Sequence, residues 1–369
     1  VPGDAGTKTS LAITEPDLFF TEEGAGIFVV MKKDAELIGN GSNAVTVKYG
    51  VDSVTTSNAD HSGGIIVNGF AKGIEISNNR VFTNNGTYGG GIRVGHPTAG
   101  DGQNTDINIH HNYVVQNGSL AATASGGGIS LYEGTHNYKV TDNYVCGNFS
   151  AGNGGGIGHL GLSDGGLIAN NKIIFNQTFN QGSTVSGGGI YVGGIPVLNA
   201  LTEGSGSVSI SGNLIQGNQA GAGDGGGIRT ALVNGTDIDG SNGRTPQDKW
   251  HRIDIVNNMI VNNMAGLAGG GISMQDTVYL FITNNTIVNN NSTATAGDAF
   301  NPGNANESLP QPAGIVSRAH SSELTQAFNR FTPVELIFYS NPEMNNNIIM
   351  DNRSFYFAID TTQDPAAFG

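Results

Sequence analysis

Charged side chains are scarce in this chain, and cationic ones are the scarcest. Asp, Glu, Lys and Arg make up 12% of the 369 residues, and 30 acidic against 16 basic residues give a net charge of −14. Binding to nucleic-acid phosphates or to anionic membranes relies on clustered Lys and Arg. The charge balance therefore argues against nucleic acid and against an anionic membrane surface as partners.

Cysteine and long apolar runs are nearly absent as well. The one cysteine, Cys146, excludes an internal disulfide and a cysteine-based metal site, and its context Tyr144-Val145-Cys146 suits a small buried apolar residue. No apolar stretch reaches the roughly 18 residues that a membrane helix requires. We expect no metal site and no membrane span.

The 11 prolines and the lack of a Gly-X-Y period exclude collagen, although glycine reaches 58 residues, about twice its usual share. Isoleucine and valine in short regular runs argue against disorder. Abundant Asn, Gly, Ser and Thr with little Lys favour a secreted or cell-surface protein. The chain opens at Val1 without a secretory signal, so we expect a mature form or a piece of a larger surface protein.

Two short motifs alternate along the chain. The first is a Gly-Gly-Ile triplet that begins at Gly63 and recurs up to Gly270, with Ala313-Gly314-Ile315 as the last copy. Each glycine pair fits a tight corner that leaves no room for a Cβ atom, and the isoleucine begins an inward-facing strand. A Walker lysine follows none of the copies, which argues against phosphate binding.

The second motif carries two asparagines five residues apart, with an aliphatic residue two positions after the first. All eight copies keep this spacing without a gap. The first asparagines are Asn79, Asn112, Asn143, Asn171, Asn213, Asn258, Asn285 and Asn347, and the second are Asn84, Asn117, Asn148, Asn176, Asn218, Asn263, Asn290 and Asn352.

These repeats predict an all-β, right-handed parallel β-helix solenoid with stacked asparagine ladders. Ile74 with Ile76 and Ile107 with Ile109 show the period of two that turns one face of a strand inward. One coil cannot bury that face alone, so the coils must stack. Asparagine tolerates left-handed backbone at the bends, and its amide can donate to one neighbouring coil and accept from the other.

The spacing also predicts the domain organisation. We expect an N-terminal coil or cap over residues 1–60, eight coils over 61–352 and a closing segment over 353–369. Long insertions near 230–252, 292–312 and 317–335 are rich in Asn, Gly, Pro and Ser, as loops are.

The chain resembles the pectin-lyase-like superfamily of right-handed parallel β-helices over roughly residues 25–355. The Gly-Gly-Gly-Ile strands with Phe82-Thr83-Asn84-Asn85 are also similar to polymorphic outer-membrane protein repeats of adhesins and autotransporter passengers. The resemblance implies a fold that catalytic and non-catalytic proteins share. For a lyase it implies a basic residue that abstracts a proton, helped by calcium; otherwise we expect no cofactor.

Alternation along the Gly-Gly-Ile strands predicts which side chains leave the core. With isoleucine inward, the residues one and three positions later point outward and line one face. This face suits an extended polysaccharide, because sugar rings pack on aromatic rings and sugar hydroxyls pair with charged groups. The outward positions are Arg93, Ser130, Tyr132, Tyr191, Arg229, Gln275 and Arg318, and close by lie His96, Glu133, His159, Asp276 and His320.

Three interpretations of this face stay open: ordinary solvated positions, a binding groove, or a catalytic site. Glycosidases need two carboxylates at a defined separation, whereas Glu133 and Asp276 are four coils apart. His159 or Arg229 would be the base of a lyase. Trp250, the only tryptophan, is either a sugar platform or a plug on the solenoid wall.

We therefore predict an extracellular or cell-surface β-helix, adhesin-like or structural, that binds a polysaccharide along one face. The alternative is a polysaccharide lyase or glycoside hydrolase of the same fold. A third hypothesis is a subunit of a larger surface assembly. The catalytic residues of the enzyme alternative are unknown.

Overall fold

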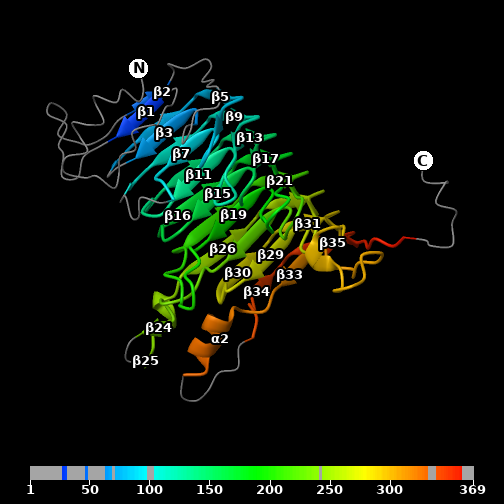
Figure 1. Ribbon diagram of the computed structural model, residues 1–369. Helices are drawn as coiled ribbons and strands as arrows, with labels where there is room; N and C mark the ends of the chain where they lie inside the picture. The colour runs from blue at the N-terminus through cyan, green and yellow to red at the C-terminus, as the bar shows by residue number, and fades with distance from the viewer. Residues whose placement is uncertain are drawn as a thin grey trace, which may run out of the picture.

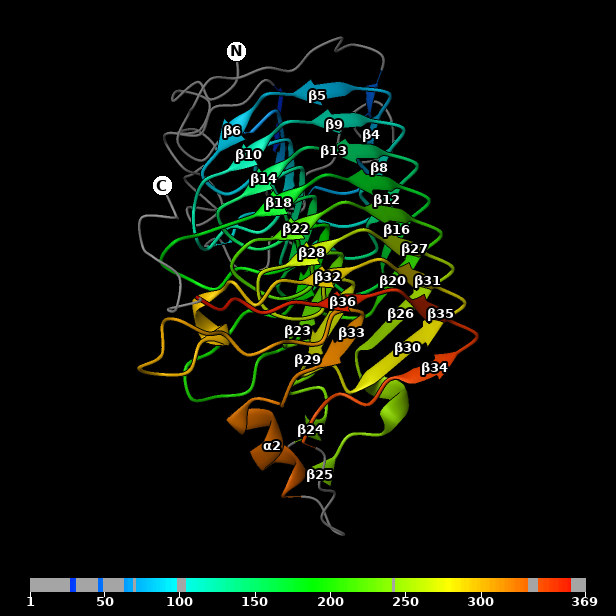
Figure 2. The same ribbon diagram turned by 90° about the vertical axis from the view of Figure 1, so that its right-hand side faces the viewer.

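The computed structural model describes residues 27–30, 46–48, 63–68, 71–97, 104–240, 243–330 and 338–359. All of their strands except one short hairpin form four parallel sheets, A to D, and the chain passes through the four in turn (Figures 1 and 2). The prediction of an all-β parallel β-helix solenoid is confirmed.

Sheet A holds the Gly-Gly-Ile strands. Its order is β1 (Ile27–Val30), β3 (Ile65–Asn68), β7 (Ile92–Val94), β11 (Ile129–Tyr132), β15 (Ile157–Leu160), β19 (Ile190–Gly193), β23 (Ile228–Ala231), β29 (Ile272–Gln275) and β33 (Ile315–Ser317).

Sheet B follows sheet A within each coil. Its order is β2 (Thr46–Lys48), β4 (Glu75–Ser77), β8 (Asn108–His110), β12 (Lys139–Thr141), β16 (Gly166–Ala169), β20 (Val208–Ser211), β26 (Arg252–Val256), β30 (Tyr279–Thr283) and β34 (Glu343–Asn345).

Sheet C lies between the two asparagine ladders. It contains β5 (Arg80–Phe82), β9 (Tyr113–Val115), β13 (Tyr144–Cys146), β17 (Lys172–Ile174), β21 (Leu214–Gln216), β27 (Met259–Val261), β31 (Thr286–Val288) and β35 (Ile348–Met350). Cys146 lies on its outer surface and is half-buried, so the expectation of a buried cysteine is wrong.

Sheet D consists of two-residue strands that lead into the next glycine pair. It contains β6 (Asn85–Gly86), β10 (Gly118–Ser119), β14 (Phe149–Ser150), β18 (Gln177–Thr178), β22 (Gln219–Ala220), β28 (Met264–Ala265), β32 (Asn291–Ser292) and β36 (Arg353–Ser354).

The core is a continuous column of isoleucine and valine inside the coils. Ile76, Ile109 and Val140 stack in register on sheet B, and all three are fully buried. In sheet C the aliphatic residue between the two asparagines has the same role, as Val145 and Ile173 show. Each coil thus covers the apolar face of its neighbour, as a solenoid requires.

Both asparagine ladders form as predicted. In the middle of the first ladder, the Asn213 side chain accepts hydrogen bonds from the backbone N–H of Asn171 at 2.9 Å and from its Nδ2 at 3.0 Å. Its own Nδ2 donates to Ile168 O at 2.9 Å and to Asn258 Oδ1 at 3.0 Å. Amides satisfy both directions of the stack without charge repulsion.

The left-handed backbone lies one position earlier than predicted. The residue before each ladder asparagine, and not the asparagine itself, has positive φ; examples are Asn78 at 58°, Asp142 at 56° and Phe175 at 55°. The ladder asparagines are therefore free to use their side chains for the stack, while the preceding residue makes the bend.

Two long connections pack on each other beside sheet A. The first follows β23 and contains the hairpin β24 (Asp239–Gly240) and β25 (Gly243–Arg244) and the short η2 (Gln247–Lys249). The second follows β33 and contains α2 (Ser322–Phe328), which begins at its N-cap Ser321. Figures 1 and 2 both show them at the same corner of the solenoid, where Trp250 and Phe328 share an apolar cluster.

The predicted N-terminal cap over residues 1–60 lies outside the described residues except for β1 and β2, as does the closing segment beyond residue 359. No helix among the described residues is long and apolar enough to cross a membrane.

Candidate functional site

The outer face of sheet A carries the predicted site residues, but turns cover much of it. Arg93, Ser130, Tyr191 and Arg229 lie in one register row, as alternation predicts. Arg93 and Tyr132 are nevertheless fully buried. The expectation of an open face is wrong for this half of the sheet, because the turn that precedes each strand folds back over it.

Tyr132 is an example of a side chain on the outer face of sheet A that turns bury. Its hydroxyl donates to Tyr88 O and accepts from the backbone N–H of Ser125 at 3.0 Å, so turns of two coils hold it. Burial raises the pKa of Tyr132. His96 is also buried, with its ring against Tyr88, whereas Glu133 is half-buried.

His159 points into the core and not onto the face. It is two positions after Ile157, and it stacks between Leu131 and Val192. Its Nδ1 lies 2.9 Å from the Tyr138 hydroxyl, and its Nε2 lies 2.9 Å from Gly161 O. Burial lowers the pKa of His159 to about 4. A neutral, enclosed imidazole of this kind is a structural residue and is no candidate for a lyase base.

Trp250 is the plug and not the platform. It is 5% exposed and packs against Ile238, Leu324 and Phe328, while its indole N–H donates to Thr245 O at 2.9 Å.

The open part of sheet A is a groove over β19, β23, β29 and the start of the α2 connection. Its volume is about 500 Å³. Four of the predicted outward residues meet there, namely Tyr191, Arg229, Gln275 and Arg318. The other lining residues are Asn153, Thr184, Ser186, Asp224, Ala231, Leu267, Asp298 and Ala319.

Asp224 organises the charges of the groove. Its carboxylate accepts two hydrogen bonds from Arg318, from Nε at 2.9 Å and from Nη2 at 2.6 Å, and one from the backbone N–H of Ala268 at 2.9 Å. Arg229 Nη1 lies 3.5 Å from Oδ2 of the same carboxylate. A bidentate Arg–carboxylate pair of this kind fixes geometry as well as charge.

Arg229 extends the network along the groove. It donates to Ser273 Oγ at 2.6 Å and to Gln275 Oε1 at 2.7 Å, and the Gln275 amide donates to Ala319 O at 3.1 Å. Burial lowers the pKa of Arg229, although nearby Asp224 opposes the shift. The guanidinium stays protonated, because its ordinary pKa lies so far above neutrality. Burial raises the pKa of Tyr191, and Arg229 opposes that shift.

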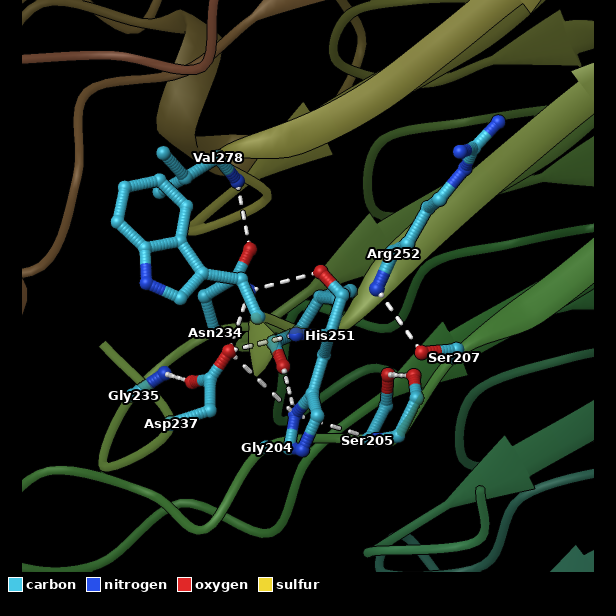
Figure 3. A network of polar contacts seen from close by, with 12 residues as sticks. Gly204, Ser205, Ser207, Asn234, Gly235, Asp237, His251, Arg252 and Val278 are labelled. Carbon is cyan, nitrogen blue, oxygen red and sulfur yellow. Dashed lines mark hydrogen bonds and ion pairs between the residues drawn. The ribbon is translucent and has the colours of Figure 1, made fainter. Parts of the chain in front are cut away.

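Polar side chains of the insertion after β23 hold the corner of the solenoid (Figure 3). The Asp237 carboxylate accepts from Asn234 Nδ2 at 2.7 Å and from the backbone N–H of His251 at 2.8 Å. Asn234 Oδ1 in turn accepts from Val278 N at 2.7 Å, which ties the insertion to the next coil.

Asp276 lies next to Gln275 in the chain but not in the groove. It lines a separate pocket formed by α2 and the insertions. Within the described ranges, no three His, Cys, Asp or Glu side chains are grouped so that they could hold a metal ion.

Sequence reasoning missed the turn residues of the groove, above all Asp224 and Asp298. Asp224 stands inside the glycine run Gly223 to Gly227, and its charge in so apolar a turn was the available signal.

Comparison of the chain with protein-family models, with curated proteins and with solved structures finds no match.

Proposed function

We propose that this β-helix is an extracellular or cell-surface module that binds a polysaccharide in the groove over sheet A. The observation that carries the proposal is the fixed network of Asp224, Arg229, Arg318 and Gln275 in a groove of about 500 Å³. The network places hydrogen-bond donors and acceptors close together, and the hydroxyls of a sugar ring can pair with both.

The charge of the groove favours a neutral polysaccharide over an acidic one. The lining contains two arginines, Arg229 and Arg318, and two carboxylates, Asp224 and Asp298, so it has no net charge. Thr184, which donates to Asp298 at 2.9 Å, adds a hydroxyl of the kind that sugars exchange hydrogen bonds with.

The network is held in place before any ligand binds. Arg229 is 7% exposed and both of its outer nitrogens have partners, so little side-chain entropy remains to be lost on binding. Arg318 has a side-chain exposure of 30% and is the cation that a ligand reaches most easily.

The test is a glycan array followed by calorimetric titration of the best neutral oligosaccharide. We expect Arg318→Gln and Gln275→Ala each to weaken binding by about tenfold, which is the loss of one or two hydrogen bonds. Arg252→Gln is the matched control, because Arg252 pairs with Asp254 on sheet B, away from the groove. Equal affinities for all variants, or no neutral glycan bound, would contradict the proposal.

The alternative proposal is a polysaccharide lyase or glycoside hydrolase of the pectin-lyase-like superfamily. Two carboxylates line the groove, which is the minimum that a hydrolase requires. Against this, two arginines and a backbone amide already engage Asp224. New reducing ends or unsaturated products from a glycan bound in the groove would favour the enzyme.

A further inference from the structure

A second pocket, of about 430 Å³, lies at the corner where α2 meets the solenoid. Four separate stretches of chain form it: the connection after β19, the start of the insertion after β23, Asp276 directly after β29, and the segment that opens α2. The lining residues are Pro196, Val197, Leu198, Asn199, Ala200, Leu201, Thr202, Leu232, Asn234, Asp276, Ser321, Glu323 and Leu324.

The pocket contains a buried carboxylate with an unused oxygen. Asp276 is fully buried; its Oδ1 accepts from Ser321 N at 2.8 Å and lies 3.1 Å from His320 Nδ1. Its Oδ2 has no hydrogen-bond partner, and neither has the buried Nε2 of His320. Leaving buried polar atoms unsatisfied costs free energy, which a hydrogen-bond donor at Oδ2 would recover.

The rest of the lining defines the chemistry of that partner. Glu323 supplies a second, half-buried carboxylate, and no Lys or Arg is among the lining residues that the structure describes. The nearby cation Arg229 is already engaged by Asp224 and Gln275. The lining from the connection after β19 is largely apolar and includes Val197 and Leu198, which are 49% and 89% exposed.

We propose that this pocket binds a primary alkylammonium group, with the ammonium at Asp276 and the aliphatic stem along residues 196–201. An ammonium offers three donors, enough for Oδ2 of Asp276 and a further acceptor. The apolar wall suits the methylene groups, as it does for the stem of a lysine side chain.

A metal ion fits the pocket less well. Divalent cations such as calcium take six or more oxygen ligands, whereas the carboxylates of this pocket are Asp276 and Glu323 and one wall is aliphatic. The proposal is independent of the polysaccharide groove, whose lining residues are different.

Tryptophan fluorescence can report on the occupancy of this pocket. Trp250, the only tryptophan, packs in one cluster with Leu201 and Leu324, and both leucines also line the pocket. An occupant between them changes the surroundings of the indole, so we expect a shift in its fluorescence.

The experiment is a titration of the full chain with n-butylammonium, followed by tryptophan fluorescence and by isothermal calorimetry. We expect saturable binding with a Kd of the order of millimolar, a fair affinity for so small a ligand. The neutral isostere n-butanol should bind at least about tenfold more weakly, because it lacks the charge. Equal binding of the two, tighter binding of calcium, or silence in both readouts would overturn the proposal.

Substitutions locate the site. Asp276→Asn keeps the shape and removes the charge, and it should weaken butylammonium binding at least about tenfold. Asp142→Asn is the matched control, because Asp142 is exposed and has the same left-handed backbone, with φ of 56° against 48° for Asp276. Glu323→Gln, at a less buried position, should weaken binding severalfold and keeps the test valid if Asp276→Asn unfolds. Unchanged affinity in both variants would also overturn the proposal.

Discussion

The central coils and the last coil of the solenoid have the same sequence motif but different surroundings. In the coil of β31, Ile287 is fully buried between neighbours, whereas Ile349, its register partner in β35, is 46% exposed. Met344 likewise is 42% exposed where its partner Ile282 is buried. A hollow of about 660 Å³ opens beside these residues. A coil therefore gains most of its stability from neighbours on both sides, as expected for a one-dimensional array.

Ladder asparagines should show the largest difference between the two regions. Asn213→Asp places a carboxylate oxygen against Ile168 O and Asn258 Oδ1, both acceptors, in a fully enclosed position. We expect a loss of about 3–5 kcal/mol in the free energy of unfolding, typical of an uncompensated buried charge. The measurement is urea denaturation followed by circular dichroism.

Asn352→Asp is the counterpart in the last coil. Asn352 donates only to Ile287 O, at 2.9 Å, and is partly open to solvent, where a carboxylate keeps part of its hydration. We expect a loss of roughly 1 kcal/mol or less. Equal losses for Asn213→Asp and Asn352→Asp would mean that neighbours on both sides do not matter.

Truncation of a core side chain should likewise cost more stability in an inner coil than in the last coil. Ile287→Ala leaves a cavity in a packed column, so we expect a cost of about 2–5 kcal/mol. Ile349→Ala should cost less than about 1 kcal/mol, since half of that side chain already meets water. Thermal melting of the two variants and the parent checks this, and a larger shift for Ile349→Ala would contradict it.

The histidine inside the central coils adds a pH dependence. His159 has its pKa lowered to about 4, whereas the unfolded chain has the ordinary value of about 6.5. Between these values the unfolded state binds more protons, so stability is full above pH 6.5 and falls as the pH drops towards 4. The whole effect is about 3 kcal/mol.

His159→Gln isolates this effect from the titration of carboxylates. We expect the variant to lose the part of the slope that lies between pH 4 and 6.5, measured as unfolding free energy at several pH values. Identical slopes in the variant and the parent would show that His159 is not the group responsible.

The sequence predicts the interior well because its rules are local and repeated. Strict periods place Ile76 and Ile109 inside and align the asparagines, and each coil confirms the next. The turns that cover the outer face of sheet A follow no such period. Tyr132 is buried because turns of different lengths fold over it, and Asp224 enters the groove from a turn. Contacts between irregular segments depend on the three-dimensional path, which alternation does not encode.

Glycine replacements give the smallest and most local comparison. A Cβ at Gly91 would lie 2.4 Å from Gly128 O, the backbone of the next coil, which is too close for any real contact. In the last coil, the atom nearest a Cβ at Gly314 is the Asn352 side-chain nitrogen, at 3.0 Å. We expect Gly91→Ala to cost about 1–3 kcal/mol, the range for overpacking.

Gly314→Ala should be close to neutral, because the Asn352 amide can move by a few tenths of an ångström and alanine restricts the unfolded chain. Urea denaturation of both variants measures the difference. If Gly314→Ala proves as costly as Gly91→Ala, the Asn352 side chain, which donates to Ile287 O, does not move aside. The glycine pair therefore tests whether the side chains of the last coil yield more easily than the backbone between inner coils.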